Sequence, residues 1–309
     1  MDARGVLKVV SRTFKLWTGQ RAFQHAAALS YYTLFSMAPL LIILIAIAGA
    51  VFGERAVSGE ITEQISDTIG PQAAEAVSAA IEQSRVQEAG LLPALLGIGA
   101  LLFGATTVFG QMQISLNQFW GVRARPSRSG IVVFLWSRLV SLGVVIIIGF
   151  LLLVSFALSV AVGAMLQFAG EMIPIPSPVV AAINAVVSLV IATLMFAVIF
   201  KVLPDVRLQW RDLWLGAFVT AVLFVVGQAL ISLYLTRTAT ASTYGAAGSL
   251  VLVLLWVYYS ALILFLGASF TRAWVQQRGA IIPPKRTAVK VRTETVEEGE
   301  RMVASGPED

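Results

Sequence analysis

The sequence predicts an all-α membrane protein built as a bundle of six transmembrane helices. Of the 309 residues, 58% are hydrophobic and only 13% are charged, whereas a soluble domain carries about 25% charged residues. The apolar residues are also gathered into long runs. A run of about 20 apolar residues is long enough to cross the hydrocarbon core of a bilayer as a helix.

Six apolar runs have the length of a spanning helix. In chain order they are Ala26–Phe52, Leu91–Gln118, Ile131–Phe168, Val179–Leu203, Leu213–Leu235 and Ala246–Trp274. The first run is longer than the apolar core of a signal peptide, so we interpret it as a retained helix.

Basic residues are distributed unevenly over the connections between these runs. Of the 22 lysines and arginines, 18 fall in the two terminal segments, in the connections after the second and fourth runs, or within two residues of the adjoining run ends. The other connections hold three, and Arg138 lies inside the third run. Because loops rich in lysine and arginine stay in the cytoplasm, both termini are predicted to be cytoplasmic. An even number of spans agrees, since it requires the termini to share a side.

The six runs divide the chain into three regions. Residues 1–25 alternate basic and apolar side chains, which predicts a cytoplasmic amphipathic helix lying on the inner leaflet. Residues 26–274 form the transmembrane domain, and its outer loop, 53–90, carries seven acidic residues and short helical repeats of isoleucine and valine. Residues 275–309 are charged and poor in aromatic side chains, which predicts a disordered cytoplasmic tail.

The residues needed for metal or acid–base catalysis are scarce. The chain has no cysteine, and its one histidine is His25, whereas a zinc enzyme uses three or four ligands. None of the 17 acidic residues lies within a predicted span, although ion pumps usually need such carboxylates. We therefore expect no enzymatic activity, no cofactor and no bound metal. The basic charge is explained by the loops, so we expect no nucleic-acid partner.

Four residues are candidates for a substrate path. Thr106, Gln113 and Asn117 lie with Gly110 on one stripe of the second predicted helix. Arg138 is the one charge more than two residues inside an apolar run, and its guanidinium suits an anionic head group. We predict that Arg138 and the stripe share a cavity open to the cytoplasmic leaflet. The alternatives are hydrogen bonds between helices for the stripe and snorkelling to head groups for Arg138.

Four stretches resemble the YihY/BrkB family of inner-membrane proteins, formerly described as ribonuclease BN. They are AAALSYYTLFSMAPLLIIL from Ala26, QISLNQFWGV from Gln113, VLPDVRLQW from Val202 and YGAAGSLVLVLLWVYYSALILFLGA from Tyr244. The resemblance implies a six-helix inner-membrane protein connected with envelope lipids. The chain departs from the family at Ser269, where glutamate is frequent, and at Asp205, where asparagine is common.

Two functions from different classes fit these observations. The first is a transporter or flippase-like protein that moves a lipid or other amphiphile in envelope biogenesis. The second is a non-transporting scaffold for envelope assembly. Membrane lipids are the expected partners in both cases, and envelope assembly proteins are further candidates. The sequence leaves the oligomeric state open, and we do not expect ribonuclease activity.

The topology has a direct test, because the native chain has no cysteine to interfere with labelling. A cysteine introduced at Ser66, in the outer loop, should react with a membrane-impermeant maleimide added from outside. A cysteine at Ser127, between the second and third spans, should react only in inverted vesicles. Labelling of the Ser66→Cys variant from the cytoplasmic side alone would reverse the predicted orientation.

Overall fold

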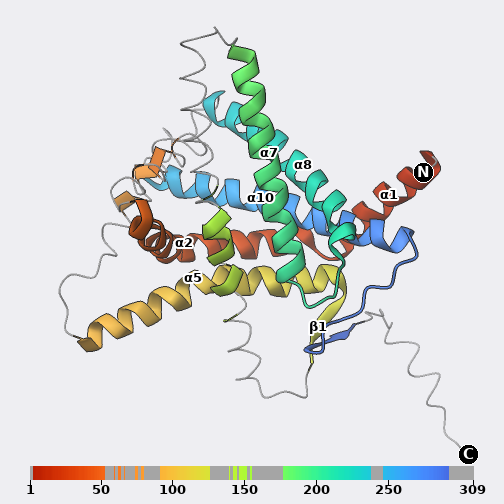
Figure 1. The fold of residues 1–309 in the computed structure, drawn as a ribbon, viewed down its shortest axis with the longest axis horizontal. Coiled ribbons are helices and arrows are strands. Elements are labelled where there is room, and N and C mark those ends of the chain that lie inside the picture. Colours follow the sequence, from red (N-terminus) through yellow and green to blue (C-terminus); the bar gives the residue numbers. More distant parts are fainter. Residues whose placement is uncertain are drawn as a thin grey trace, which may run out of the picture.

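The computed structural model describes residues 3–52, 91–125, 177–237 and 246–291, with scattered positions between 59 and 79 and between 139 and 154. The described part is mostly helical (Figure 1). Its helices are α1 (Ala3–Gly19), α2 (Ala22–Phe52), α5 (Leu91–Trp120), α7 (Ser177–Val202), α8 (Trp210–Arg237) and α10 (Ala246–Gln277). Two short strands, β1 (Val122–Ala124) and β2 (Ala288–Lys290), follow α5 and α10.

Three helices are long and apolar enough to cross a membrane. Their apolar segments are Ala185–Val202 in α7, Trp210–Gln228 in α8 and Leu250–Gln277 in α10. These segments coincide with the fourth, fifth and sixth runs of the sequence, which confirms the helical membrane fold. The first two runs coincide with α2 and α5, of 31 and 30 residues. Most of the third run and of the outer loop lies outside the described residues, so the count of six spans stays a prediction.

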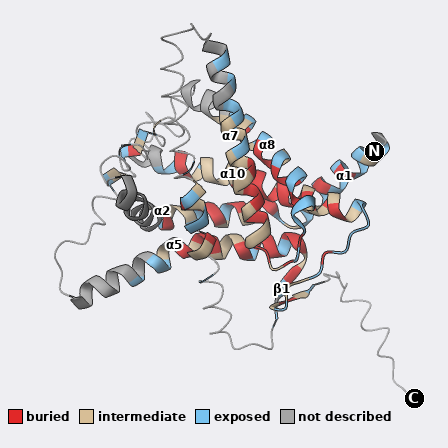
Figure 2. Ribbon diagram, viewed as in Figure 1, coloured by how far each residue is buried: buried red, intermediate tan, exposed pale blue. Residues whose placement is uncertain are grey.

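Helix α10 is the centre of the described packing. It contacts α1, α2, α5 and α8, while α2 also packs against α5 and α7 against α8. The buried residues gather where α2, α5 and α10 run beside one another (Figure 2). Phe119 of α5 stacks on Phe265 of α10 with ring centroids 4.8 Å apart, and the His25 ring of α2 lies edge-on to both. This cluster joins three helices at one end of the bundle.

Two glycine–threonine pairs bring α8 and α10 into close contact. A Cβ atom added at Gly216 would lie 1.9 Å from Oγ1 of Thr271, and one at Gly267 would lie 1.9 Å from Oγ1 of Thr220. The threonines donate hydrogen bonds within their own helices, Thr220 to the Gly216 carbonyl at 2.6 Å and Thr271 to that of Gly267 at 2.7 Å. The arrangement is reciprocal, so each helix offers one glycine groove and one threonine ridge.

After α10 the chain folds back across the ends of the other helices. Strand β2 pairs antiparallel with β1, with Arg123 opposite Val289. Val206 forms an isolated bridge with Pro284, and the Arg207 N–H donates to the Pro283 carbonyl at 2.9 Å. Residues 275–291, which the sequence assigns to a disordered tail, therefore carry the last turn of α10, a loop and a strand. Residues 292–309 lie outside the described part of the chain.

The close contact between α8 and α10 predicts a strong effect of small substitutions. Gly216→Ala and Gly267→Ala should each destabilise the fold by about 1–3 kcal/mol, because the added methyl group overlaps a β-branched side chain that has few alternative rotamers. Thermal unfolding of the purified protein in detergent measures the effect.

Gly99→Ala in α5 is the matched control, because nothing lies within 4 Å of the position of its added Cβ. Its unfolding temperature should be unchanged or slightly raised. Equal unfolding temperatures for all three variants would contradict the close helix contact.

Candidate functional site

Helix α5 buries a stripe of polar side chains while several of its apolar side chains are exposed. Thr106, Gln113 and Asn117 are 4%, 7% and 9% exposed, whereas Phe103 and Ile114 on the same helix are 56% and 61% exposed. In a water-soluble protein the polar face of a helix would be the exposed one. The inverted pattern fits a helix whose outer face meets lipid and whose polar stripe faces its neighbours.

Asn117 holds the end of α5 to the loop between α7 and α8. Its Nδ2 donates to Oδ2 of Asp205 at 2.9 Å, and its Oδ1 accepts from the backbone N–H of Asp205 at 2.7 Å. An asparagine at position 205 would offer a similar acceptor oxygen to Nδ2. The family's common residue therefore fits here, and Asn117 has a clear structural task.

The other predicted site residues have different outcomes. Thr106 donates to the Leu102 carbonyl of its own helix at 2.6 Å. Gln113 is buried on the same stripe, one turn before Asn117. Arg138 lies outside the described residues, so its shared cavity with the stripe stays a prediction. The stripe thus combines a hydrogen bond within α5 at Thr106, a contact to the α7–α8 loop at Asn117 and a buried amide at Gln113.

Lys285 completes the junction around Asp205. Its backbone N–H donates to the Asp205 carbonyl at 2.8 Å, and its Nζ donates to the Val202 carbonyl at 3.1 Å. The pKa of Lys285 is lowered from its usual value, mainly because burial disfavours the charged form. The carboxylate of Asp205 acts in the opposite direction, and the nearby Lys201 lowers the pKa further. Lys201 itself donates to the Leu208 carbonyl. The two lysines therefore serve as caps for backbone carbonyls at the end of α7 and in the following loop.

Ser269 occupies a fully buried position in α10. It is 0% exposed, and its Oγ has no hydrogen-bond partner among the described residues. Arg272 lies one turn further along, and its Nη1 donates to the Phe119 carbonyl of α5. A glutamate at position 269 would lie on the helix face of Arg272. In this chain the guanidinium instead holds the end of α5.

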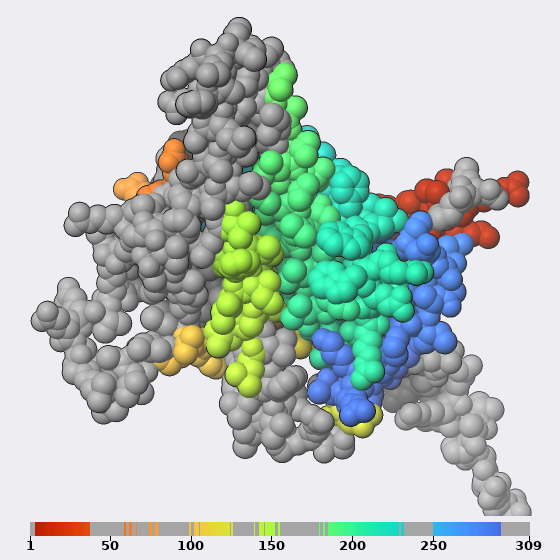
Figure 3. Space-filling view, viewed as in Figure 1, coloured from red at the N-terminus to blue at the C-terminus, as the bar shows by residue number. Residues whose placement is uncertain are grey.

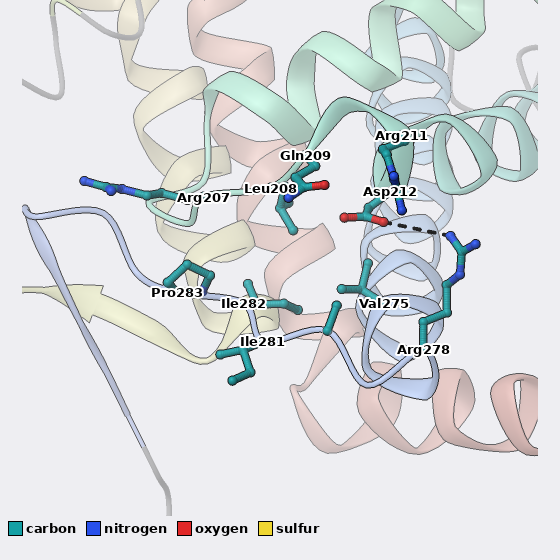
Figure 4. A pocket seen from close by; sticks show the side chains of 11 residues that line it. Arg207, Leu208, Gln209, Arg211, Asp212, Val275, Arg278, Ile281, Ile282 and Pro283 are labelled. Atoms are coloured by element: carbon teal, nitrogen blue, oxygen red, sulfur yellow. Dashed lines mark ion pairs between the residues drawn. The ribbon is translucent and has the colours of Figure 1, made fainter.

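A basic pocket opens between the start of α8 and the segment after α10 (Figure 4). Its volume is about 450 Å³, within the range of about 300–1,000 Å³ typical of ligand pockets. It is lined by Arg207, Leu208, Gln209, Arg211, Asp212, Val275, Arg278, Ala280, Ile281, Ile282 and Pro283. Sequence reasoning used these arginines only for topology. These arginines line one pocket only because the chain folds back after α10, which no local sequence pattern predicts.

One ion pair lies at the edge of this basic pocket. Nη1 of Arg278 is 3.9 Å from Oδ1 of Asp212, and the Arg278 guanidinium also lies 5.5 Å from the ring centroid of Trp274. Arg211 and Arg278 both lie beside Asp212, whereas the Arg207 side chain, at the other end of the pocket, points away from them (Figure 4). With three arginines and one aspartate, the lining has two unbalanced positive charges.

Comparison with known proteins places this architecture in a family. The sequence model of the virulence factor BrkB family matches residues 13–291. The chain belongs to this BrkB family. It is 28% identical to a UPF0761 membrane protein of Mannheimia succiniciproducens over 80% of this chain and 83% of the relative. A UPF0761 membrane protein of Psychromonas ingrahamii is also 28% identical, over 80% of each chain.

A third relative is longer than this BrkB-family chain. The UPF0761 membrane protein of Teredinibacter turnerae is 27% identical over 87% of this chain but over 61% of its own length. No solved structure matches the chain. The relatives' names and the three candidate spans agree that the BrkB-family chain is a membrane protein.

The contacts of Asn117 predict that the residue supports stability. Asn117→Ala removes two hydrogen bonds, one of them to a carboxylate, and should lower the free energy of unfolding by about 2–3 kcal/mol. Asp205→Asn keeps the backbone donor and an acceptor oxygen, so its cost should stay below about 1 kcal/mol. Thermal unfolding in detergent compares the two. A larger loss for Asp205→Asn than for Asn117→Ala would contradict this geometry.

Proposed function

We propose that this membrane protein is a transporter or flippase-like protein that moves a lipid or another amphiphile in envelope biogenesis. Its site is the cell inner membrane, with six spanning helices and both termini in the cytoplasm. The 18 basic residues on one side of the predicted topology, against three on the other, support this orientation. Membrane lipids are the proposed substrates, and the lipids of the surrounding bilayer are the proposed partners.

The inverted polarity of α5 is the observation that carries the proposal. A polar head group that crosses a bilayer needs polar side chains away from lipid, and membrane helices place such groups toward the bundle interior. Gln113 is 7% exposed while its neighbour Ile114 is 61% exposed. Ser115, on the opposite side of α5, is also buried, and its Oγ lies 3.0 Å from Nδ1 of His25 on α2. Polar groups from two helices therefore meet beneath an apolar outer face.

A scaffold for envelope assembly is the second candidate, and a different observation favours it. The Asn117–Asp205 contact and the β1–β2 pairing join the ends of α5, α7, α8 and α10. A scaffold benefits from such a rigid face and needs no polar interior. We do not propose a catalytic activity under either reading, because the sequence offers one histidine, no cysteine and no acidic residue within the predicted spans.

Reconstitution into proteoliposomes separates the two functions. The transporter proposal expects the native chain to accelerate the exchange of a fluorescent phospholipid between leaflets. Gln113→Met, which keeps the side-chain length but removes both polar groups, should reduce the rate to near the background of empty vesicles. The rate is followed by dithionite quenching of the label in the outer leaflet.

Ile114→Met is the control, because it changes the exposed apolar face of the same helix and should leave the rate unchanged. Both variants should insert and unfold like the native chain. Lipid exchange at the background rate for the native chain, with phospholipid and with solute probes, would favour the scaffold.

A further inference from the structure

The exposed apolar side chains of α8 show which part of the helix lies in the bilayer, and so at what depth the basic pocket lies. Six large apolar side chains recur at every fourth position along this helix, each between 36% and 59% exposed: Trp210, Trp214, Phe218, Val222, Val226 and Leu230. The stripe covers twenty residues, or about 30 Å at about 1.5 Å per residue, which matches the hydrocarbon thickness of a bilayer. Side chains four apart differ by about 40° around a helix of 3.6 residues per turn, so the six together wind around about half of α8. This broad exposed side of α8 is the one that meets lipid.

The two tryptophans at the start of the stripe mark a membrane interface. Trp210 and Trp214 lie with ring centroids 6.3 Å apart, and tryptophan is enriched at the level of the lipid head groups. Lys201 adds a cation 5.6 Å from the Trp210 ring centroid. The pocket is lined by residues 207–209, 211 and 212, directly at this end of α8. It consequently opens at head-group depth.

The second wall of the pocket also faces the membrane. Ile281, in the loop after α10, is 85% exposed although it is a large apolar side chain. At head-group depth such a side chain can reach the acyl boundary, whereas in water it would be unfavourable. Figure 3 shows α8 and the segment after α10 side by side on one face of the molecule. The pocket therefore combines a basic rim with apolar walls beside the lipid.

We propose that this pocket binds the phosphate head group of an anionic phospholipid of the adjacent leaflet. Arg211 supplies a positive charge beside Asp212 and Arg207 a second one at the other end of the pocket, while Arg278 is held by Asp212 and Trp274 at the rim. One guanidinium can donate two parallel N–H hydrogen bonds to two phosphate oxygens. Basic pockets at helix ends are typical head-group sites. The acyl chains lie along the exposed stripe of α8. Binding at this site does not depend on transport.

Native mass spectrometry of the full chain, purified with equal amounts of phosphatidylglycerol and phosphatidylcholine, tests the proposal. The native chain should retain phosphatidylglycerol preferentially. Arg207→Gln combined with Arg211→Gln should reduce this preference by about 25-fold, at about fivefold for each basic residue near an anionic lipid. These substitutions leave the Arg278–Asp212 ion pair in place, so the variant should keep its thermal stability.

The control is Arg123→Gln combined with Arg125→Gln, which removes the same charge from exposed residues outside the pocket. This variant should keep the native preference. Equal losses in both variants, or no loss in the pocket variant, would overturn the proposal. Inorganic phosphate and glycerol phosphate, added separately, should not displace the lipid at millimolar concentration. Displacement by either would assign the pocket to a free anion instead.

Discussion

The close contact of α8 with α10 is the interaction on which the described bundle depends. Lipid tails are as apolar as leucine side chains, so burial from water does not hold two membrane helices together. Close packing and hydrogen bonds must do so instead. The Gly216–Thr271 and Gly267–Thr220 pairs provide that packing without leaving a hydroxyl unpaired, because each threonine donates to its own helix. Helix α10 can then carry α1, α2 and α5 on its other sides.

The polar contacts are concentrated where the helices end. Asn117 and Asp205 join α5 to the α7–α8 loop, and Lys285 joins the same loop to the segment after α10. Backbone groups left free at helix ends need partners, and the fold-back after α10 supplies several of them. This segment therefore has a structural role, and its order follows from its hydrogen bonds rather than from its composition.

Helical runs were predictable from the sequence, whereas contacts between distant segments were not. Apolar length alone located the runs that became α7, α8 and α10. The α8–α10 crossing was not predicted from the sequence, since it uses Gly216 with Thr220 and Gly267 with Thr271 in place of two glycines. The buried stripe of Thr106, Gln113 and Asn117 was visible as a helical pattern, but the Asp205 partner of Asn117 lies 88 residues away. The segment after α10 was predicted to be disordered because it is highly charged. Composition gives no information on the backbone pairing of this segment with β1.

The arginines at the end of α8 show why charge counts alone could not locate a site. Lysine and arginine are retained on cytoplasmic loops for topology, so each of them has a sufficient explanation before the fold is known. A lipid-binding site additionally requires several basic side chains in one pocket, at head-group depth and beside apolar side chains. Arg207 and Arg211 precede and begin α8, while Arg278 and Ile281 come from a segment some seventy residues later. Their meeting depends on the α8–α10 contact, so the glycine–threonine crossing positions the basic pocket as well as the helices.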